Sequence, residues 1–197
     1  RATHLVFDMD GLLLDTERFY TIAQQRILDR FGQEFDPALK AKMMGRTSME
    51  SARIFIEGTG LEGRLTPEAF LEERAQILHG LFPQAQLMPG VRRLLSHIAQ
   101  HSIPACIATS SNRRHFELKT GRHIDLFSQA FSHFVVGDDV NQGKPHPEIF
   151  QLAASRFAAA PESPGDVLVF EDAANGVAAA RAGGFRVVHV PWEGMPP

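Results

Sequence analysis

DMDGLLLDT, residues 8–16, closes the short apolar run Leu5–Asp8 and carries two aspartates one residue apart. Short apolar runs that lead into turn residues are typical of buried β-strands. Four further runs of this kind follow along the chain: Ala105–Thr109, Phe134–Val136, Val167–Phe170 and Phe185–Val190. We therefore predict five buried strands, and the first of them ends in the Asp8-x-Asp10 pair.

Segments with a helical spacing of apolar residues lie next to the later strands. One runs from Val91 to Ile98, another follows Pro147, and an Ala-rich segment ends at Gly183-Gly184, where glycine is a typical C-terminal cap. Strands that alternate with helices indicate a parallel sheet covered by helices on both faces. The predicted fold class is therefore α/β with a parallel sheet.

Residues 15–87 interrupt this alternation with helical signals and no convincing strand. Residues 47–50 form a capping-box pattern, and residues 66–67 pair a capping threonine with a proline in the first helical turn. We predict an all-helical insert over residues 15–87 and a core made of residues 1–14 and 88–197. The insert is either extra packing or a lid over the ligand edge of the sheet that selects the substrate.

The composition fits a folded globular protein and excludes several classes of partner. The 197 residues are 44% hydrophobic and 22% charged, with a formal net charge of −3, so we expect no nucleic acid partner. The single cysteine, Cys106, excludes a disulfide framework and a thiolate zinc site. No apolar stretch approaches the ~20 residues of a membrane span, so we expect no membrane partner. We expect a cytoplasmic monomer, or an organelle protein if a leader precedes Arg1.

Polar residues follow the carboxyl end of each of the first four predicted strands. In chain order they are Asp8, Asp10 and Gly11; Thr109, Ser110 and Ser111; Asp138, Asp139 and Lys144; and Glu171 and Asp172. Ligands of open parallel sheets bind beyond these ends, where the strand order reverses. The sequence therefore predicts one cleft that holds several carboxylates, several hydroxyls and one lysine.

The carboxylates of this predicted cleft favour a hard divalent cation, because acids gathered in one pocket repel one another and shift towards protonation. Mg²⁺ prefers oxygen ligands and commonly binds one or two carboxylates together with substrate phosphate oxygens. We predict Mg²⁺ held by Asp8 and Asp172, with Glu171 beside them and the backbone carbonyl of Asp10 completing the set. The alternative for Glu171-Asp172 is that they cap the following helix.

Asp8 and Asp10 can take different roles in one reaction. A carboxylate against a metal ion is deprotonated and can act as a nucleophile, which is the role predicted for Asp8. Asp10 can give a proton to a leaving group and later take one from water. Gly11 then allows the backbone to turn sharply out of the strand.

A phosphoryl group in this cleft could interact with Lys144, Thr109 and Ser110. The ammonium of Lys144 would offset anionic charge during phosphoryl transfer, whereas the alternative is a solvated surface lysine. Thr109 and Ser110 can donate hydrogen bonds to phosphoryl oxygens, although Thr-Ser-Ser at a strand end is also ordinary turn chemistry. We predict Thr109 and Lys144 as catalytic residues.

Four segments of the chain, taken in order, resemble the four motifs of the haloacid dehalogenase superfamily of phosphotransferases. They are DMDGLLLDT at 8–16, IATSS at 107–111, GKPHPEIF at 143–150 and VFEDAANGV at 169–177. The resemblance implies a Rossmann-like sheet of strand order 3-2-1-4-5 with a helical cap inserted after the first motif. It also implies an aspartyl-phosphate mechanism and Mg²⁺ as the cofactor.

The resemblance implies roles for particular residues. Asp8 stands at the position of the nucleophile, Asp10 at that of the general acid/base, Thr109 at the second-motif hydroxyl and Lys144 at the third-motif lysine. Glu171 and Asp172 stand at the metal-binding fourth motif. The remaining motif residues, expected to bind substrate, are Gly11, Thr16, Ser110 and Ser111.

The segments DGLLLDTERFY and ATSSNRRHFELKTGRH are most similar to the pseudouridine 5′-phosphatase group and to its relatives, the glycerol-3-phosphate phosphatases. In such caps the segment Gly45-Arg46-Thr47 resembles a substrate-contacting loop, so Arg46 is either a phosphate or hydroxyl ligand or a solvated arginine. Ala174 stands where the group commonly has proline. The dehalogenases themselves lack the second aspartate, so Asp10 favours phosphate esters as substrates.

The resemblance thus implies a Mg²⁺-dependent phosphomonoester hydrolase that acts on a small phosphorylated metabolite. Two alternatives remain at this point. A sugar-phosphate mutase of the β-phosphoglucomutase kind shares the motifs, although such enzymes usually bring a histidine and a lysine from the cap. A non-catalytic binder could keep the fold alone, but it would not need both Asp8 and Asp10.

Overall fold

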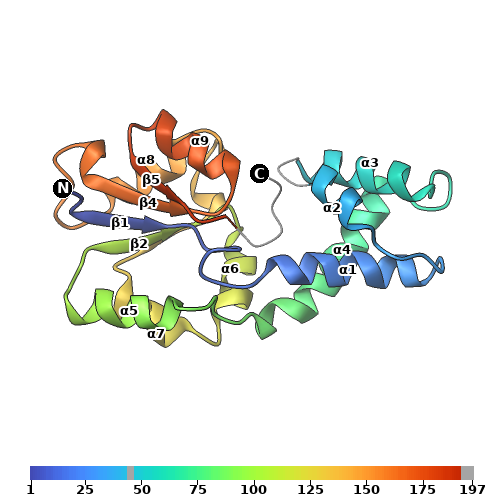
Figure 1. Cartoon of the computed structure of the whole chain (residues 1–197), viewed down its shortest axis with the longest axis horizontal. Helices are drawn as coiled ribbons and strands as arrows, with labels where there is room; N and C mark the ends of the chain where they lie inside the picture. The colour runs from blue at the N-terminus through green and yellow to red at the C-terminus, as the bar shows by residue number, and fades with distance from the viewer. Residues whose placement is uncertain (44–46, 192–197) are drawn as a thin grey trace. The chain divides into compact units, whose positions relative to one another are not determined.

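The computed structural model describes residues 1–43 and 47–191. These residues divide into two compact units, a sheet unit within Arg1–Asp15 and Pro83–Glu193 and a helical unit within Thr16–Phe82 (Figure 1). Among the helices of the described residues, none combines the length and the hydropathy that crossing a membrane requires.

The sheet unit contains one parallel sheet of strand order β3-β2-β1-β4-β5, which confirms the predicted fold class. The strands are β1 (His4–Phe7), β2 (Ala105–Ala108), β3 (Phe134–Val135), β4 (Val167–Glu171) and β5 (Arg186–His189). β1 lies at the centre, where Val6 pairs with Cys106 on one side and Val169 on the other. All five predicted strands are present, with ends that differ by at most one residue from the expected ones.

Helices cover both faces of this sheet. They are α5 (Val91–Gln100), α6 (Arg113–Thr120), α7 (Ile124–Ala130), α8 (Glu148–Ser155) and α9 (Ala174–Ala182). In Figure 1, α8 and α9 lie on one face of the sheet, and α5 and α7 lie on the other. Buried side chains of α8 and α9, among them Ile149, Phe150 and Ala179, pack with Val6 and Val169 into one apolar core. Burial of these side chains drives the layering.

α6 and α7 were not predicted from the sequence. α6 has the sequence RRHFELKT, in which charged residues outnumber apolar ones, so a hydrophobic period is weak. Its start is fixed by a cap instead, because the Asn112 side chain accepts a hydrogen bond from the backbone N–H of His115 (2.8 Å). The helix buries Phe116, Lys119 and Thr120.

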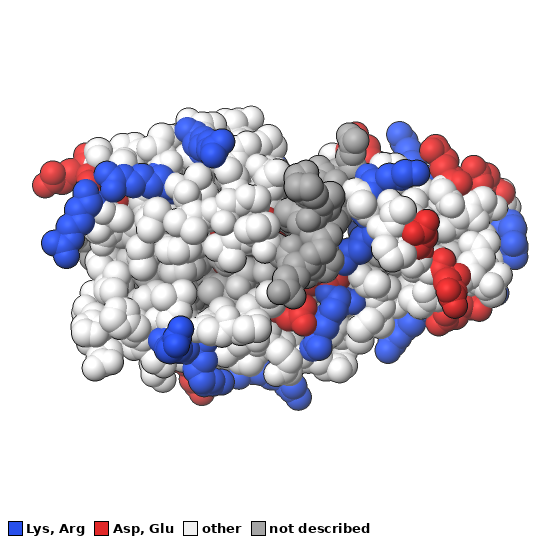
Figure 2. All heavy atoms as spheres, viewed as in Figure 1, with Lys and Arg blue, Asp and Glu red and all other residues white. Residues whose placement is uncertain are grey.

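Within its described residues the helical unit contains helices and no strand, as predicted for the insert after the first strand. It contains α1 (Glu17–Asp29), α2 (Pro37–Met43), α3 (Ser48–Thr59) and α4 (Pro67–Leu81). Thr47 and Glu50 form the predicted capping box at the start of α3, and Thr66 accepts the N–H of Ala69 ahead of α4. A core of Ile27, Ala52, Phe55 and Phe70 holds the unit together. Figure 2 shows acidic and basic side chains interspersed on the drawn face of this unit.

The two chain segments that connect the units run side by side in the sheet unit. Leu14 pairs with Leu87, and the N–H of Asp15 donates to the carbonyl of Gln86 (2.9 Å). Asp15 and residues 83–87 therefore belong to the sheet unit, whereas we predicted them as part of the insert.

Candidate active site

The chain turns sharply at the carboxyl end of β1. The N–H of Asp8 still donates to the carbonyl of Phe170 (3.0 Å), as a continuation of the β1–β4 pairing. Gly11 then has φ of 78° and donates its N–H to the carbonyl of Leu14 (2.9 Å). Side chains with a Cβ disfavour this left-handed backbone, so glycine serves the turn that the sequence predicted here. The turn keeps Asp8 and Asp10 together at one edge of the sheet.

Lys144 joins Asp8 to Glu171 across the carboxyl ends of β1 and β4. Its Nζ donates to Asp8 Oδ1 and to Glu171 Oε1, both at 2.5 Å, and to the carbonyl of Ala108 at 3.2 Å. All three charged side chains are buried, with 3% of the Lys144 side chain exposed. The buried ring of Phe150 lies 4.9 Å from Nζ and adds a cation–π contact. The alternative that Lys144 is a solvated surface lysine is therefore wrong.

Burial raises the pKa of Asp8 to about 7. Attraction to Lys144 opposes this rise, whereas the negative charges of Glu171 and Asp10 add to it. Burial by itself would lower the pKa of Lys144, but its attraction to Asp8 and Glu171 raises it, so Lys144 stays protonated. One buried ammonium thus does not neutralise the acids gathered around it.

Three carboxylates in this place suit a hard divalent cation. Among the described residues, Asp8, Glu171 and Asp172 each offer one oxygen, and these oxygens lie within 4.8 Å of one another. All three residues are buried. Oxygen donors that converge in this way, with more negative charge than Lys144 offsets, are the set that Mg²⁺ prefers. The residues present therefore fit a Mg²⁺ ion.

The Asp10 side chain forms hydrogen bonds with a different set of residues. Its Oδ2 accepts hydrogen bonds from Ser111 Oγ (2.8 Å) and, more weakly, from Thr109 Oγ1 (3.4 Å). Its Oδ1 accepts from Nζ of Lys119 (2.7 Å), which also donates to Ser111 Oγ (2.9 Å). The carboxylate of Asp10 is 23% exposed, whereas Lys119 is buried. Asp8 and Asp10 are thus paired with different lysines.

Lys119 was not predicted as a site residue from the sequence. The sequence signal for it is weak, because α6 lacks a clear hydrophobic period, and the structure is what shows Lys119 buried on one helix face with Phe116 and Thr120. Lysine on the buried face of a helix is uncommon without a charged partner. The ion pair with Asp10 accounts for the burial of Lys119.

The loop after β2 combines turn chemistry with contacts to Asp10. The N–H of Ser111 donates to Thr109 Oγ1 (3.1 Å), which closes a local turn. Thr109 is buried and Ser110 is exposed. A Cβ added to Gly137 would approach the carbonyl oxygen of Ser110 to 2.5 Å, so the segment after β3 needs glycine for this close approach.

Glu171 has a second partner at the start of α9. Its Oε2 accepts the N–H of Ala173 (3.0 Å), so the helix-capping alternative holds for Glu171 alongside its ion pair with Lys144. A Cβ added to Gly176, in the first turn of α9, would overlap the Glu171 carboxylate. The absence of a side chain at Gly176 therefore leaves the space that this carboxylate fills.

Asp138 and Asp139 were expected in the same cleft, and the structure gives them other partners. Asp139 pairs with Arg113 (3.2 Å) and with Arg156 (2.9 Å), and Asp138 accepts the N–H of Arg113 (2.8 Å). Hydrogen bonds from Arg156 and Val136, together with the positive charge of Arg156 and Arg113, outweigh the effect of burial and lower the pKa of Asp139. These acids hold the loop after β3 in place.

Two predicted substrate-binding residues lie elsewhere in the chain. Thr16 begins the helical unit, immediately before α1, and its surface is fully buried. Arg46 lies outside the described residues.

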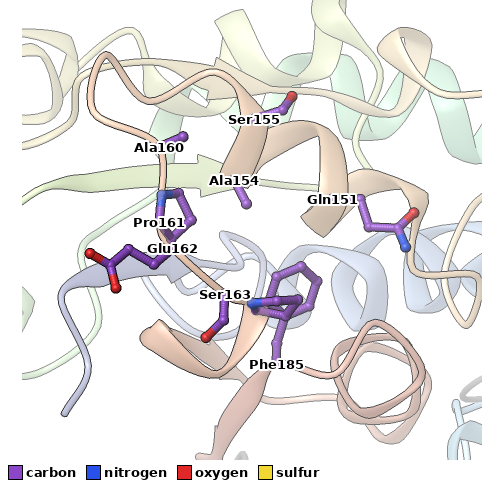
Figure 3. Close-up of a pocket in the computed structure, with 9 residues that line it drawn as sticks. Gln151, Ala154, Ser155, Ala160, Pro161, Glu162, Ser163 and Phe185 are labelled. Atoms are coloured by element: carbon purple, nitrogen blue, oxygen red, sulfur yellow. The ribbon is translucent and has the colours of Figure 1, made fainter.

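A separate pocket lies near the amino ends of β4 and β5, next to the segments that precede these strands. It has a volume of about 260 Å³ and is lined mainly by apolar side chains that include Ala154, Pro161, Pro164 and Phe185. Figure 3 shows Glu162 as the one acidic side chain among the labelled residues. The pocket lies apart from the carboxyl ends of the strands that carry Asp8 and Asp172.

Comparison with known proteins places the chain among hydrolases. Residues 2–184 match the model of the haloacid dehalogenase-like hydrolases. The chain is 54% identical to "(DL)-glycerol-3-phosphatase 2" of Arabidopsis thaliana, over 96% of this chain and 79% of that protein. It is 45% identical to "Probable pseudouridine-5'-phosphatase" of Drosophila melanogaster, over 97% of this chain and 82% of that protein.

A solved structure is also similar over most of the chain. The crystal structure of a putative beta-phosphoglucomutase from Thermotoga maritima has a TM-score of 0.76 and 33% sequence identity. The match covers 95% of this chain and 86% of that one.

Proposed function

The chain belongs to the haloacid dehalogenase-like hydrolase family, and we propose from this premise that it is a Mg²⁺-dependent phosphatase of small phosphorylated metabolites. Glycerol-3-phosphate and pseudouridine 5′-phosphate are the first candidate substrates, because phosphatases of these compounds are the relatives with 54% and 45% identity. One observation carries the proposal. Asp8 is buried next to Lys144 and the acidic pair Glu171-Asp172, at the carboxyl end of the central strand.

Asp8 is the proposed nucleophile. One of its carboxylate oxygens forms a bond to the phosphorus of the substrate while the ester P–O bond breaks. The electron pair of that bond goes to the leaving oxygen, which takes a proton from the carboxyl group of Asp10. The products of this step are an alcohol, a phosphorylated Asp8 and an Asp10 carboxylate.

In the second step Asp10 acts as a general base. It takes a proton from a water molecule whose oxygen forms a bond to phosphorus, while the bond from phosphorus to Asp8 breaks. This releases inorganic phosphate and restores the Asp8 carboxylate and the Asp10 carboxyl. The separate partners of the two side chains support separate roles, since Asp10 is held by Ser111 and Lys119 and Asp8 by Lys144.

Asp8, Glu171 and Asp172 would hold the Mg²⁺ ion, and the backbone carbonyl of Asp10 is the further ligand that we propose. When bound, the ion neutralises negative charge on the carboxylates and the phosphoryl group. Lys144 stays protonated and contributes a fixed positive charge at the same place. Thr109 and Ser110 are the proposed donors to phosphoryl oxygens, and Ser111, whose hydroxyl donates to Asp10, stays a predicted substrate-binding residue.

The helical unit is the proposed lid and substrate selector. Arg46 is its proposed contact to the phosphate or to a hydroxyl group, and Thr16 and Gly11 complete the proposed first-motif contacts. A cytoplasmic or organelle location and a monomeric state stay predictions.

A sugar-phosphate mutase is the second candidate, and the likeness to the putative beta-phosphoglucomutase favours it. A mutase keeps its phosphoryl group on the enzyme or the substrate, so it interconverts sugar phosphates without net release of phosphate. A phosphatase releases inorganic phosphate at the rate at which it consumes the ester.

A panel of phosphate esters tests the proposal. The panel contains glycerol-3-phosphate, pseudouridine 5′-phosphate, glucose 1-phosphate and p-nitrophenyl phosphate, and inorganic phosphate is measured with Mg²⁺ present. We expect stoichiometric release of phosphate from at least one small alkyl ester. Interconversion of glucose phosphates without phosphate release would favour the mutase, and no turnover of any ester would contradict both candidates.

Removal of Mg²⁺ is expected to abolish turnover and to lower stability. Excess EDTA should reduce kcat by at least about 100-fold, and added Mg²⁺ should restore it, because the ion offsets the charge of three carboxylates. Saturating Mg²⁺ should raise the Tm by about 5 °C, since a ligand at 100 times its Kd stabilises by about 2.7 kcal/mol. Differential scanning calorimetry measures this shift.

Asp172→Asn is the matched control for the stability measurement. It removes one charged ligand of the three, so the Tm rise caused by Mg²⁺ should fall to less than half that of the unchanged protein. An equal Tm rise in both proteins would place the ion elsewhere.

Gly176→Ala is expected to displace the Glu171 carboxylate, because the new Cβ would overlap it. Displacement weakens the ion pair with Lys144 and the metal ligand set, so kcat should fall by at least about 10-fold. Gly80→Ala is the control, because Gly80 is also helical and has open space around its Cβ position. Unchanged kcat in Gly176→Ala would show that Glu171 does not need its present position.

A further inference from the structure

Lys119 is a buried lysine outside the four motifs and 1% exposed. It lies on α6, which the chain enters after the loop at the carboxyl end of β2. Lysine is almost never fully buried unless it is paired, and its partners here are Asp10 and Ser111. We propose that Lys119 is a positioning residue, which holds the carboxyl group of Asp10 where it can protonate the leaving oxygen. This inference rests on the proposed function.

The contacts around Asp10 fix the plane of its carboxyl group. Nζ of Lys119 donates to Oδ1 (2.7 Å), and Oγ of Ser111 donates to Oδ2 (2.8 Å). Nζ also donates to Ser111 Oγ (2.9 Å), so the three side chains form a closed ring of hydrogen bonds. Donors on both oxygens oppose rotation about the terminal torsion, which is otherwise broad for aspartate. Loss of Lys119 would leave Oδ1 without this donor.

The two buried lysines serve different halves of the reaction. Lys144 contacts Asp8 and Glu171, which belong to the phosphoryl side. Lys119 contacts Asp10, which belongs to the leaving-group side. A group held by a positioning partner loses catalytic power when that partner is removed, because proton transfer needs correct geometry. Lys119 should therefore matter only where Asp10 acts on the substrate.

Substrates with different leaving groups distinguish a positioning role of Lys119 from a purely structural one. An alkyl phosphate leaves as an alkoxide that needs a proton from Asp10, whereas p-nitrophenyl phosphate leaves as a stable phenolate that does not. The ratio kcat/KM reports the steps up to transfer of the phosphoryl group to Asp8. General damage to the fold would lower this ratio for both substrates by the same factor.

Lys119→Met is the test variant, since methionine fills a similar volume without the charge. We expect kcat/KM for the best alkyl phosphate of the panel to fall by about 100-fold, and that for p-nitrophenyl phosphate by less than about 3-fold. Arg92→Met, an exposed cation to methionine change on α5, is the control and should change neither ratio. Equal losses for the two substrates, or no loss for either, would overturn the inference.

A double variant covers the case in which Lys119→Met does not fold. Asp10→Asn with Lys119→Met removes both charges of the pair and leaves no unpaired buried ion. If Lys119 acts through Asp10, this protein has the same kcat/KM for the alkyl phosphate as Asp10→Asn alone, within about 3-fold. A further large loss in the double variant would overturn the inference. Absence of phosphatase activity in the unchanged protein would instead contradict the proposed function.

Discussion

Asp8→Asn is expected to lower kcat for phosphate release by at least about 10⁴-fold, because asparagine cannot form the phosphorylated intermediate. The change is nearly isosteric, so the position of Lys144 and its contact with Glu171 should persist. Steady-state release of inorganic phosphate from the best ester of the panel measures the loss. Residual kcat within about 10-fold of the unchanged protein would contradict the assignment of Asp8.

The same variant should not lose stability. Asp8 has a pKa of about 7 in the folded protein, above its ordinary value of 3.8, so its charged form destabilises the fold. With its folded pKa raised, Asp8 contributes stability to the metal-free protein below about pH 4, and this contribution is lost as the pH rises from about 4 to about 7. Asparagine lacks this titration.

Thermal unfolding in EDTA at several pH values checks the expectation. At pH 8 the Tm of Asp8→Asn should equal or exceed that of the unchanged protein, and the difference should shrink as the pH falls to about 4. A Tm well below that of the unchanged protein at pH 8 would show that the Asp8 carboxylate stabilises the metal-free fold.

Lys144→Met is expected to have the largest combined effect on stability and activity. It removes the ammonium from two buried carboxylates, Asp8 and Glu171, and breaking a buried ion pair in this way costs about 3–5 kcal/mol. Loss of a fixed positive charge beside the transferred phosphoryl group should lower kcat by about 10²–10³-fold. Urea denaturation and phosphate release measure the two effects.

Two further variants test whether the loss of stability in Lys144→Met comes from the loss of its buried ion pairs. Lys42→Met changes an exposed lysine and should alter the free energy of unfolding by less than about 0.5 kcal/mol. Lys144→Met with Glu171→Gln leaves one fewer buried charge and should recover part of the lost stability, but not the activity. Full stability in Lys144→Met alone would contradict the buried ion pair.

The sheet and its order could be predicted because their signals are local. Each strand is a short apolar run, and Gly183-Gly184 and Thr47-x-x-Glu50 mark helix ends through their own backbone contacts. The order of the strands came from the family resemblance. α6 was missed since its burial depends on Phe116 and Lys119 meeting residues of other segments.

The convergence of Asp8, Lys144, Glu171 and Asp172 could also be predicted, because parallel strands bring their carboxyl ends to one edge. The contacts of Lys119 with Asp10 and of Gly176 with Glu171 could not be predicted from the sequence. Both depend on one side chain filling the space that a distant residue leaves, and a single sequence gives no such distances. The ion pairs of Asp139 could not be predicted for the same reason, since its partners Arg113 and Arg156 are remote in sequence.

Chemical trapping of the phosphorylated enzyme tests the central claim most directly. The Asp10→Asn protein is mixed with p-nitrophenyl phosphate and Mg²⁺, quenched in acid and treated with borohydride, which reduces an acyl phosphate to an alcohol. Peptide mass spectrometry then locates the modified residue. We predict conversion of Asp8 to homoserine that depends on substrate. An unmodified Asp8 in a sample that has released p-nitrophenol, or modification of another acid, would contradict the account.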